Sequence, residues 1–134
     1  MLAPNIINSL YRYGLWLGFY CDDVEVHLIK ITRKMTNDTL FNIIISLRRT
    51  LIQRCQSTLS PQSSDLLGTY ISHLSACDRE ILALTYLFHL SSNEIAMVCQ
   101  LSESTVKRRL TMIRYRLHAA IHAHNKKQES SDVN

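Results

Sequence analysis

Residues Ser91–Leu117 read SSNEIAMVCQLSESTVKRRLTMIRYRL, and this stretch decides the fold that we expect. Ser91 is followed three residues later by Glu94, which is the spacing of a capping box at the start of a helix. Residues 100–102 then form a polar turn around one leucine, and Ser102 can cap a second helix. The pattern therefore predicts two helices joined by a tight turn, which is the layout of a helix-turn-helix.

The second helix combines an apolar stripe with a polar, cationic side. The stripe recurs every three or four residues and should be buried; it consists of Val106, Leu110, Ile113, Leu117 and Ile121. The other side carries hydroxyls near its start and cations further along: Ser104, Thr105, Lys107, Arg108, Arg109, Thr111, Arg114 and Arg116, with Met112 and Tyr115. Hydroxyls and arginines can contact base edges, and outer cations can contact phosphates. A cationic face that is merely solvated would show the same pattern.

Several short segments resemble region 4 of bacterial sigma factors. They are NEIA at 93–96, LS at 101–102, STVK at 104–107 and RL at 109–110, and LSACDREIL at 74–82 resembles the first helix of that region. The resemblance covers about residues 70–120. It implies a helix-turn-helix that binds promoter-like DNA beside RNA polymerase.

The N-terminus resembles a narrower family. SLYRYGLW at residues 9–16 is similar to the aromatic W-G-x-W segment that opens the smaller Q-type antitermination proteins of lambdoid phages, with Tyr13 where that family tends to have Trp. These proteins are short and helical, and they end in a sigma-region-4-like helix-turn-helix. The resemblance implies a protein that binds beside a phage late promoter, engages paused RNA polymerase and suppresses termination. None of these steps requires catalysis by the protein, so we expect that it is not an enzyme.

The resemblance also implies roles for the exposed side chains of the second helix. Bases would be read by Ser104, Thr105, Lys107, Arg108 and Thr111. The DNA backbone would be held by Arg109, Arg114 and Arg116. A small sigma factor or sigma-like activator is the alternative, although residues 1–55 are short for a module that opens a promoter. A helical interaction protein without a DNA role is a further alternative.

The distribution of charge favours the DNA-binding interpretation. Residues 1–102 hold eight Lys/Arg and eight Asp/Glu, whereas residues 103–127 hold seven Lys/Arg and one acid. The excess of positive charge therefore lies on and after the second helix, as expected of a nucleic-acid binder. A basic amphipathic membrane helix is the weaker interpretation, because the apolar stripe has no aromatic anchors.

Composition favours an all-α fold. The chain has 134 residues with only three Gly and two Pro, and it is 46% hydrophobic. We expect an N-terminal helical region over residues 1–63, a helix-turn-helix region over 64–125 and a fraying polar tail over 126–134. The serine-rich segment QSTLSPQSSD at 56–65 is the expected linker between the first two. Either Ser64 or Asp65 should cap the helix that follows.

Three N-terminal segments carry helical signals. Pro4 fits a first helical turn, and five aromatic residues lie between Tyr11 and Tyr20. These aromatics indicate either a core anchor or a docking surface for a protein partner. Residues 24–35 fit a strand or a helix, and we expect a helix because no partner strand is available. A strong helix then runs from residues 37–38 to about Cys55, with three off-stripe arginines that are either solvated or in contact with nucleic acid: Arg48, Arg49 and Arg54.

The remaining signals are mostly negative. The four cysteines form no C-x-x-C pair, so we expect reduced, buried thiols in the cytoplasm of a bacterial host. No apolar run is long enough for a membrane span, and no signal peptide is apparent. His118 and His122 have the spacing of two ligands on one helix face, but no third ligand follows. We therefore expect no metal site and no cofactor.

Overall fold

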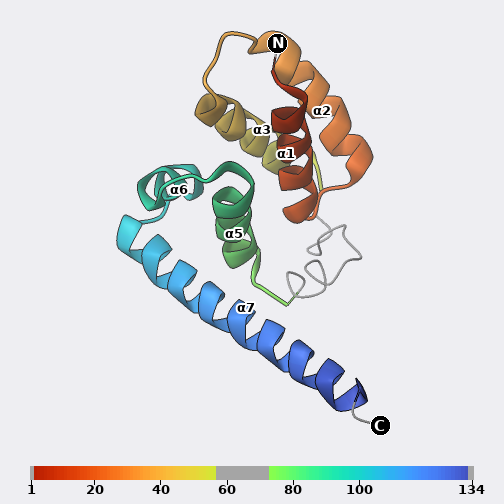
Figure 1. The fold of residues 1–134 in the computed structure, drawn as a ribbon. Coiled ribbons are helices and arrows are strands. Elements are labelled where there is room, and N and C mark those ends of the chain that lie inside the picture. Colours follow the sequence, from red (N-terminus) through yellow and green to blue (C-terminus); the bar gives the residue numbers. More distant parts are fainter. Residues whose placement is uncertain (1, 57–72, 133–134) are drawn as a thin grey trace.

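The computed structural model describes residues 2–56 and 73–132. In these ranges the chain forms helices and no β-strand, which confirms the all-α expectation. The helices are α1 (Pro4–Trp16), α2 (Cys21–Lys34), α3 (Leu40–Arg54), α5 (Ala76–Phe88), α6 (Ser92–Cys99) and α7 (Glu103–Asp132). Figure 1 shows α1–α3 grouped as an N-terminal body above α5 and α6, with α7 extending away from both. Most of the expected linker and the expected cap at Ser64 or Asp65 lie outside the described residues.

Helices α1 and α2 approach closely at a glycine. A Cβ atom added to Gly14 would lie only 2.6 Å from a methyl carbon of Val24, which is itself fully buried. Glycine therefore allows the two helices to pack at this point. The turn between them contains Gly18 in a positive-φ conformation (φ 93°), which favours glycine because it has no side chain.

Residues 24–35 adopt the helical alternative. Their apolar positions Val24, Leu28 and Ile31 are buried on one side of α2, which is the helix stripe rather than the strand pattern. Asp22 and Asp23 lie in the first turn, and Arg33 and Lys34 lie in the last turn, an arrangement that complements the helix dipole.

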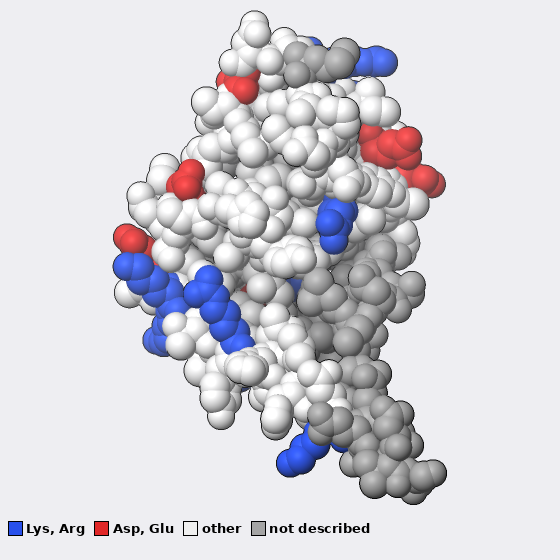
Figure 2. All heavy atoms as spheres, in the orientation of Figure 1, with Lys and Arg blue, Asp and Glu red and all other residues white. Residues whose placement is uncertain are grey.

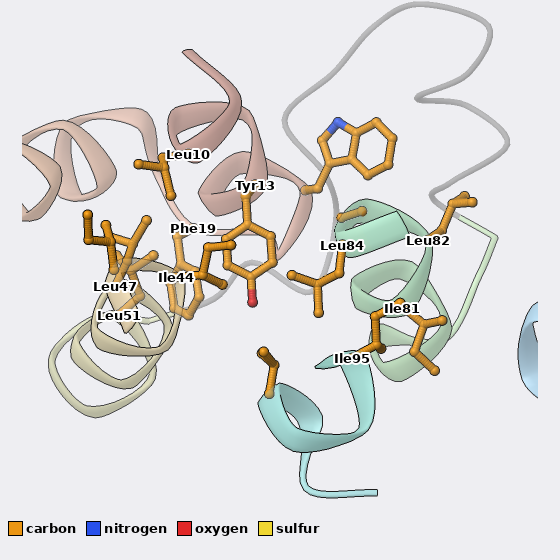
Figure 3. Close-up of a cluster of buried hydrophobic side chains, with 14 of the residues drawn as sticks. Leu10, Tyr13, Phe19, Ile44, Leu47, Leu51, Ile81, Leu82, Leu84 and Ile95 are labelled. Atoms are coloured by element: carbon orange, nitrogen blue, oxygen red, sulfur yellow. The ribbon is translucent and has the colours of Figure 1, made fainter. Parts of the chain in front are cut away.

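The N-terminal aromatics mainly anchor the core. Tyr13, Trp16 and Phe19 are buried, which confirms the core interpretation for these three, whereas Tyr20 is 54% exposed. Figure 3 shows the Tyr13 ring between Ile44 of α3 and Leu84 of α5. Tyr13 also packs edge-on against Phe88, with ring centroids 5.8 Å apart.

The N-terminal body and the helix-turn-helix region share one core. Helix α1 packs against α5, and the indole of Trp16 stacks on Tyr86 at a centroid distance of 6.1 Å. The buried residues of α1, α2 and α3 belong to the same hydrophobic cluster as those of α5, α6 and α7. The two regions on either side of the linker are therefore held together by side-chain packing.

The stripe of α7 is buried only over its first half. Val106, Leu110 and Ile113 are buried as predicted, but Leu117 is half-buried and Ile121 is 48% exposed. The expectation that all five residues would be buried was wrong for these last two. Helix α7 also continues to Asp132, so the polar tail expected to fray over residues 126–134 is helical up to Asp132. Leu117 and Ile121 are less buried because α5 and α6 pack against the start of α7, and its far end projects beyond them (Figure 1).

The four cysteines are all free, as expected, but none is buried. Cys21 is exposed, and the other three are half-buried: Cys55, Cys77 and Cys99. The expectation of buried thiols was therefore wrong.

Among the described residues, none of the helices is both long and apolar enough to cross a membrane.

Candidate DNA-binding helix-turn-helix

Helix α6 begins with the capping box that the sequence predicts. The backbone N–H of Glu94 donates to the Ser91 hydroxyl at 3.2 Å, and the backbone N–H of Ser91 donates to the Glu94 carboxylate at 3.0 Å. The helix ends at Gln100, whose left-handed conformation (φ 58°) reverses the chain. The next N–H, that of Leu101, donates to the carbonyl of Ala96 and closes the turn. Local chemistry thus fixes where α6 starts and stops.

Helix α7 begins at the cap expected for Ser102. The Ser102 hydroxyl accepts a hydrogen bond from the backbone N–H of Thr105 at 3.2 Å, and it lies 2.6 Å from the Thr105 hydroxyl and 3.3 Å from that of Ser104. Thr105 is half-buried, so its hydroxyl belongs to the cap of α7. Ser104 is exposed one residue earlier. The start of α7 therefore presents Ser104 to solvent more openly than Thr105.

Arg109 ties α7 to α5. Its guanidinium donates to the carboxylate of Asp78 at 3.1 Å, and the side chains are 38% and 17% exposed. The hydrogen bond to Asp78 raises the pKa of Arg109. Asp78 lies in the first turn of α5, where the Ser75 hydroxyl accepts from its backbone N–H. Arg109 was expected to hold the DNA backbone, and the structure places it in an ion pair between helices.

The remaining predicted residues lie on the exposed side of α7. Ser104, Lys107, Arg108, Thr111, Arg114 and Arg116 are all exposed. Lys107 forms an exposed ion pair with Glu103 one turn earlier, at 3.3 Å. The Thr111 hydroxyl donates to the backbone carbonyl of Lys107 at 2.9 Å. Figure 2 shows blue side chains gathered over the start of α7, at the left of the view. The helix therefore presents a cationic surface, defined here as Lys107, Arg108, Arg114 and Arg116.

Two apolar side chains interrupt this cationic surface. Tyr115 is 73% exposed and Met112 is 48% exposed. Both were assigned to this side by the helical spacing of the sequence, and the structure confirms their exposure. Aromatic and thioether groups can contact thymine methyls or sugars without any hydrogen-bonding requirement.

A buried polar cluster lies behind the helix-turn-helix. The Tyr13 hydroxyl of α1 donates to Glu80 of α5 at 2.5 Å, and Arg48 of α3 donates to both carboxylate oxygens of Glu80, at 2.7 and 3.2 Å. Arg48 was expected to be solvated or to touch nucleic acid, and the structure instead pairs it with Glu80. We name these three residues the Glu80 cluster. Glu80 was not predicted from the sequence, because its partners lie 67 and 32 residues away.

The Glu80 cluster shifts the acidity of its members. Burial raises the pKa of the Tyr13 hydroxyl well above its ordinary value, and the neighbouring charge of Glu80 acts in the same direction. Burial alone would lower the pKa of Arg48, but the hydrogen bond and charge of Glu80 raise it above its ordinary value. Tyr13 therefore stays a neutral donor and Arg48 stays a cation. The cluster joins α1, α3 and α5 by charge-assisted hydrogen bonds.

Among the side chains that the structure describes, the cysteines and histidines show no arrangement that indicates catalysis or metal binding. Burial raises the pKa of the Cys99 thiol, which is opposite to the shift that activates a nucleophilic cysteine. His118 and His122 are both exposed on α7. In the part of the chain that the structure describes, no group of three or more His, Cys, Asp or Glu side chains could hold a metal ion.

A match to a known protein family agrees with the helix-turn-helix arrangement of α6 and α7. Residues 64–117 match the family described as sigma-70, region 4. The match covers α5, α6 and the buried half of α7, together with the segment before α5. No curated protein and no solved structure matches this chain. The chain thus carries a sigma-region-4-like helix-turn-helix, a DNA-binding type of domain, and its function is related to transcription.

Proposed function

We propose that the exposed side of α7 enters the major groove of double-stranded DNA. The observation that carries this proposal is the cationic surface on a helix whose start is fixed by the turn after α6. Ser104, Arg108 and Thr111 point away from the core and have the donors and acceptors needed to read base edges. Lys107, Arg114 and Arg116 would contact phosphates on either side.

Arg109 and Thr105 take a different part in this proposal. Arg109 is paired with Asp78, so it would orient α7 relative to α5 before DNA binds. Thr105 would hold the first turn of α7 through the Ser102 hydroxyl. Both residues would support binding by keeping the reading helix in place, with little direct contact to bases.

We further propose that the protein acts on transcription as a phage late-gene antitermination factor. The support is the resemblance of residues 9–16 to the aromatic segment of the Q-type family, in a short helical chain with a sigma-region-4-like region at its C-terminal end. The protein would bind beside a promoter, engage RNA polymerase through its N-terminal body and suppress termination. It would act without catalysis, in the cytoplasm of a bacterial host.

In vitro transcription across a hairpin terminator tests this proposal. One template carries, beside the promoter, a DNA site that was selected with the purified protein. The control template lacks this site. Read-through that needs the site is expected, because loading requires polymerase held next to the bound protein. Read-through that ignores the site would contradict the proposed loading mechanism.

A matched pair of variants separates DNA binding from the later step. Arg108→Ala should weaken both site binding and read-through. Val26→Ser with Ile29→Ser changes two exposed apolar residues of α2 and should leave site binding intact. Loss of read-through in the second variant would support a polymerase contact by the N-terminal body. Deleting that body is not a useful test, because its removal would uncover the core of α5.

A small sigma factor is the second candidate function. The match to sigma-70 region 4 favours it directly, since such a region is a component of sigma factors. The same transcription assay distinguishes the two. New initiation at promoters that are silent without the protein, with no read-through, would support the sigma-like alternative.

A further inference from the structure

Helices α2 and α3 form a groove that is separate from the surface of α7. The groove has a volume of about 560 Å³, and its walls carry His27, Lys30 and Lys34 from α2 and Ser46, Thr50 and Arg54 from α3. Ile31 and Met35 also line it, together with Asp38 from the turn between the helices. Figure 1 shows both helices in the N-terminal body, away from the projecting end of α7.

Positive charge dominates this groove. Lys30, Lys34 and Arg54 are exposed, and Asp38 is the single carboxylate among the described residues that line it. In the described ranges, ion pairs involve Arg48, Lys107 and Arg109, and none involves the three cations of the groove. These cations are therefore available to an anionic ligand.

We infer that this groove binds the phosphodiester backbone of duplex DNA, as a second and sequence-independent contact. The α2 wall carries two lysines, and the α3 wall carries two hydroxyls and an arginine. These are side chains that often contact phosphates. Proteins that bind single strands add aromatic side chains on which bases stack, and no Phe, Tyr or Trp is among the described residues lining this groove. The absence of such a stacking surface favours the backbone of a duplex.

This inference rests on the proposed DNA binding by α7 and extends it. The surface of α7 would select the site, and the groove would add affinity that depends on salt and not on sequence. The distribution of charge along the chain gives no hint of such a groove, since residues 1–102 are neutral in sum. Folding places Arg54 in the same groove as Lys30 and Lys34, and Asp38 is the one acidic residue among the described residues that line it.

A charge-matched pair of triple variants tests the groove. The groove variant is Lys30→Gln, Lys34→Gln and Arg54→Gln. The control variant is Arg12→Gln, Arg33→Gln and Arg49→Gln, which removes the same charge from exposed residues that do not line the groove. Circular dichroism of both variants verifies the helical content. Affinity for a fluorescent duplex of arbitrary sequence, for single-stranded DNA and for RNA is measured by anisotropy across a range of salt concentrations.

The groove variant is expected to bind the duplex about tenfold more weakly at low salt, with a salt slope reduced by about 0.9 for each phosphate that the protein no longer neutralises. The control variant should keep the parent slope. Equal slopes for the two variants would overturn the inference while leaving binding by α7 intact. A weakening confined to single strands would also overturn it. A parent protein that binds no duplex would overturn the inference and the proposed function together.

The single variants Lys34→Gln and Arg33→Gln provide a second measurement. They neutralise adjacent residues of α2, and only Lys34 lines the groove. Lys34→Gln should lower the duplex salt slope by about 0.9, and Arg33→Gln should leave it unchanged. Identical slopes in these two variants would contradict the assignment of the groove.

Discussion

The Glu80 cluster and the cationic surface of α7 both carry arginines, but in opposite surroundings. Arg48 is largely buried and lies 2.7 Å from Glu80, so its charge is already neutralised inside the protein. Arg108 is exposed, and the ion pairs of the described residues involve Arg48, Lys107 and Arg109 instead. Burial and pairing thus separate a cation that holds helices together from one that is available to DNA. Sequence alone does not distinguish the two, because both arginines lie off the apolar stripes of their helices.

Removing the shared acid should produce the largest effect. Glu80→Ala leaves Arg48 partly buried without its counter-ion and Tyr13 without an acceptor, so the unfolding free energy should fall by roughly 3–5 kcal/mol. Urea denaturation followed by circular dichroism measures this change. Glu103→Ala breaks the exposed pair with Lys107 and should cost less than about 0.5 kcal/mol. Similar losses of stability in the two variants would show that the cluster is no more important than a surface ion pair.

The two halves of α7 allow a second comparison. Leu110 is buried against the other helices, so Leu110→Ala should lower the unfolding free energy by about 2–5 kcal/mol. Ile121 belongs to the same sequence stripe but is 48% exposed, and Ile121→Ala should change stability by no more than about 0.5 kcal/mol. Thermal and urea unfolding of both variants provide the measurement. A large destabilisation by Ile121→Ala would mean that the far half of α7 is packed in solution.

What the sequence predicted correctly was encoded locally. The caps at Ser91 and Ser102 each involve partners within three residues, so spacing alone revealed them. The helical stripe of α2 was equally readable, because its period needs no distant information. The turn at Gln100 was located, although its left-handed conformation was not foreseen.

What the sequence did not predict depends on distant partners. Arg48 meets Glu80 across 32 residues, and Arg109 meets Asp78 across 31, so neither pair leaves a local pattern. The exposure of Ile121 has the same origin, since a stripe is buried only where another helix covers it. Of the eight residues expected to contact DNA, Thr105 and Arg109 are the two that are half-buried, and both contact other residues of the protein. Periodicity found the correct side of α7 but could not show which side chains already had partners.

The neighbouring residues Arg108 and Arg109 give the sharpest test of this distinction. Arg108→Ala should weaken binding to a selected DNA site by about 1–3 kcal/mol and relax its sequence preference, with little change in stability. Arg109→Ala breaks a partly exposed ion pair and should lower stability by up to about 1 kcal/mol. Anisotropy titrations and urea unfolding of both variants separate the two effects. If Arg108→Ala bound the selected site as well as the parent, the assignment of the reading residues would be wrong.

The smallest expected effect concerns Arg116, which is exposed beyond the last fully buried residue of the stripe, Ile113. At that position a guanidinium can contact phosphate but lies past the hydroxyls that would read bases. Arg116→Ala should therefore weaken specific and non-specific duplex binding alike, and it should lower the salt slope by about 1. The measurement is the affinity for a selected and an unrelated duplex across a salt series, with Arg12→Ala on α1 as the control. A weakening confined to the selected duplex would assign Arg116 to base reading and would extend the reading surface along α7.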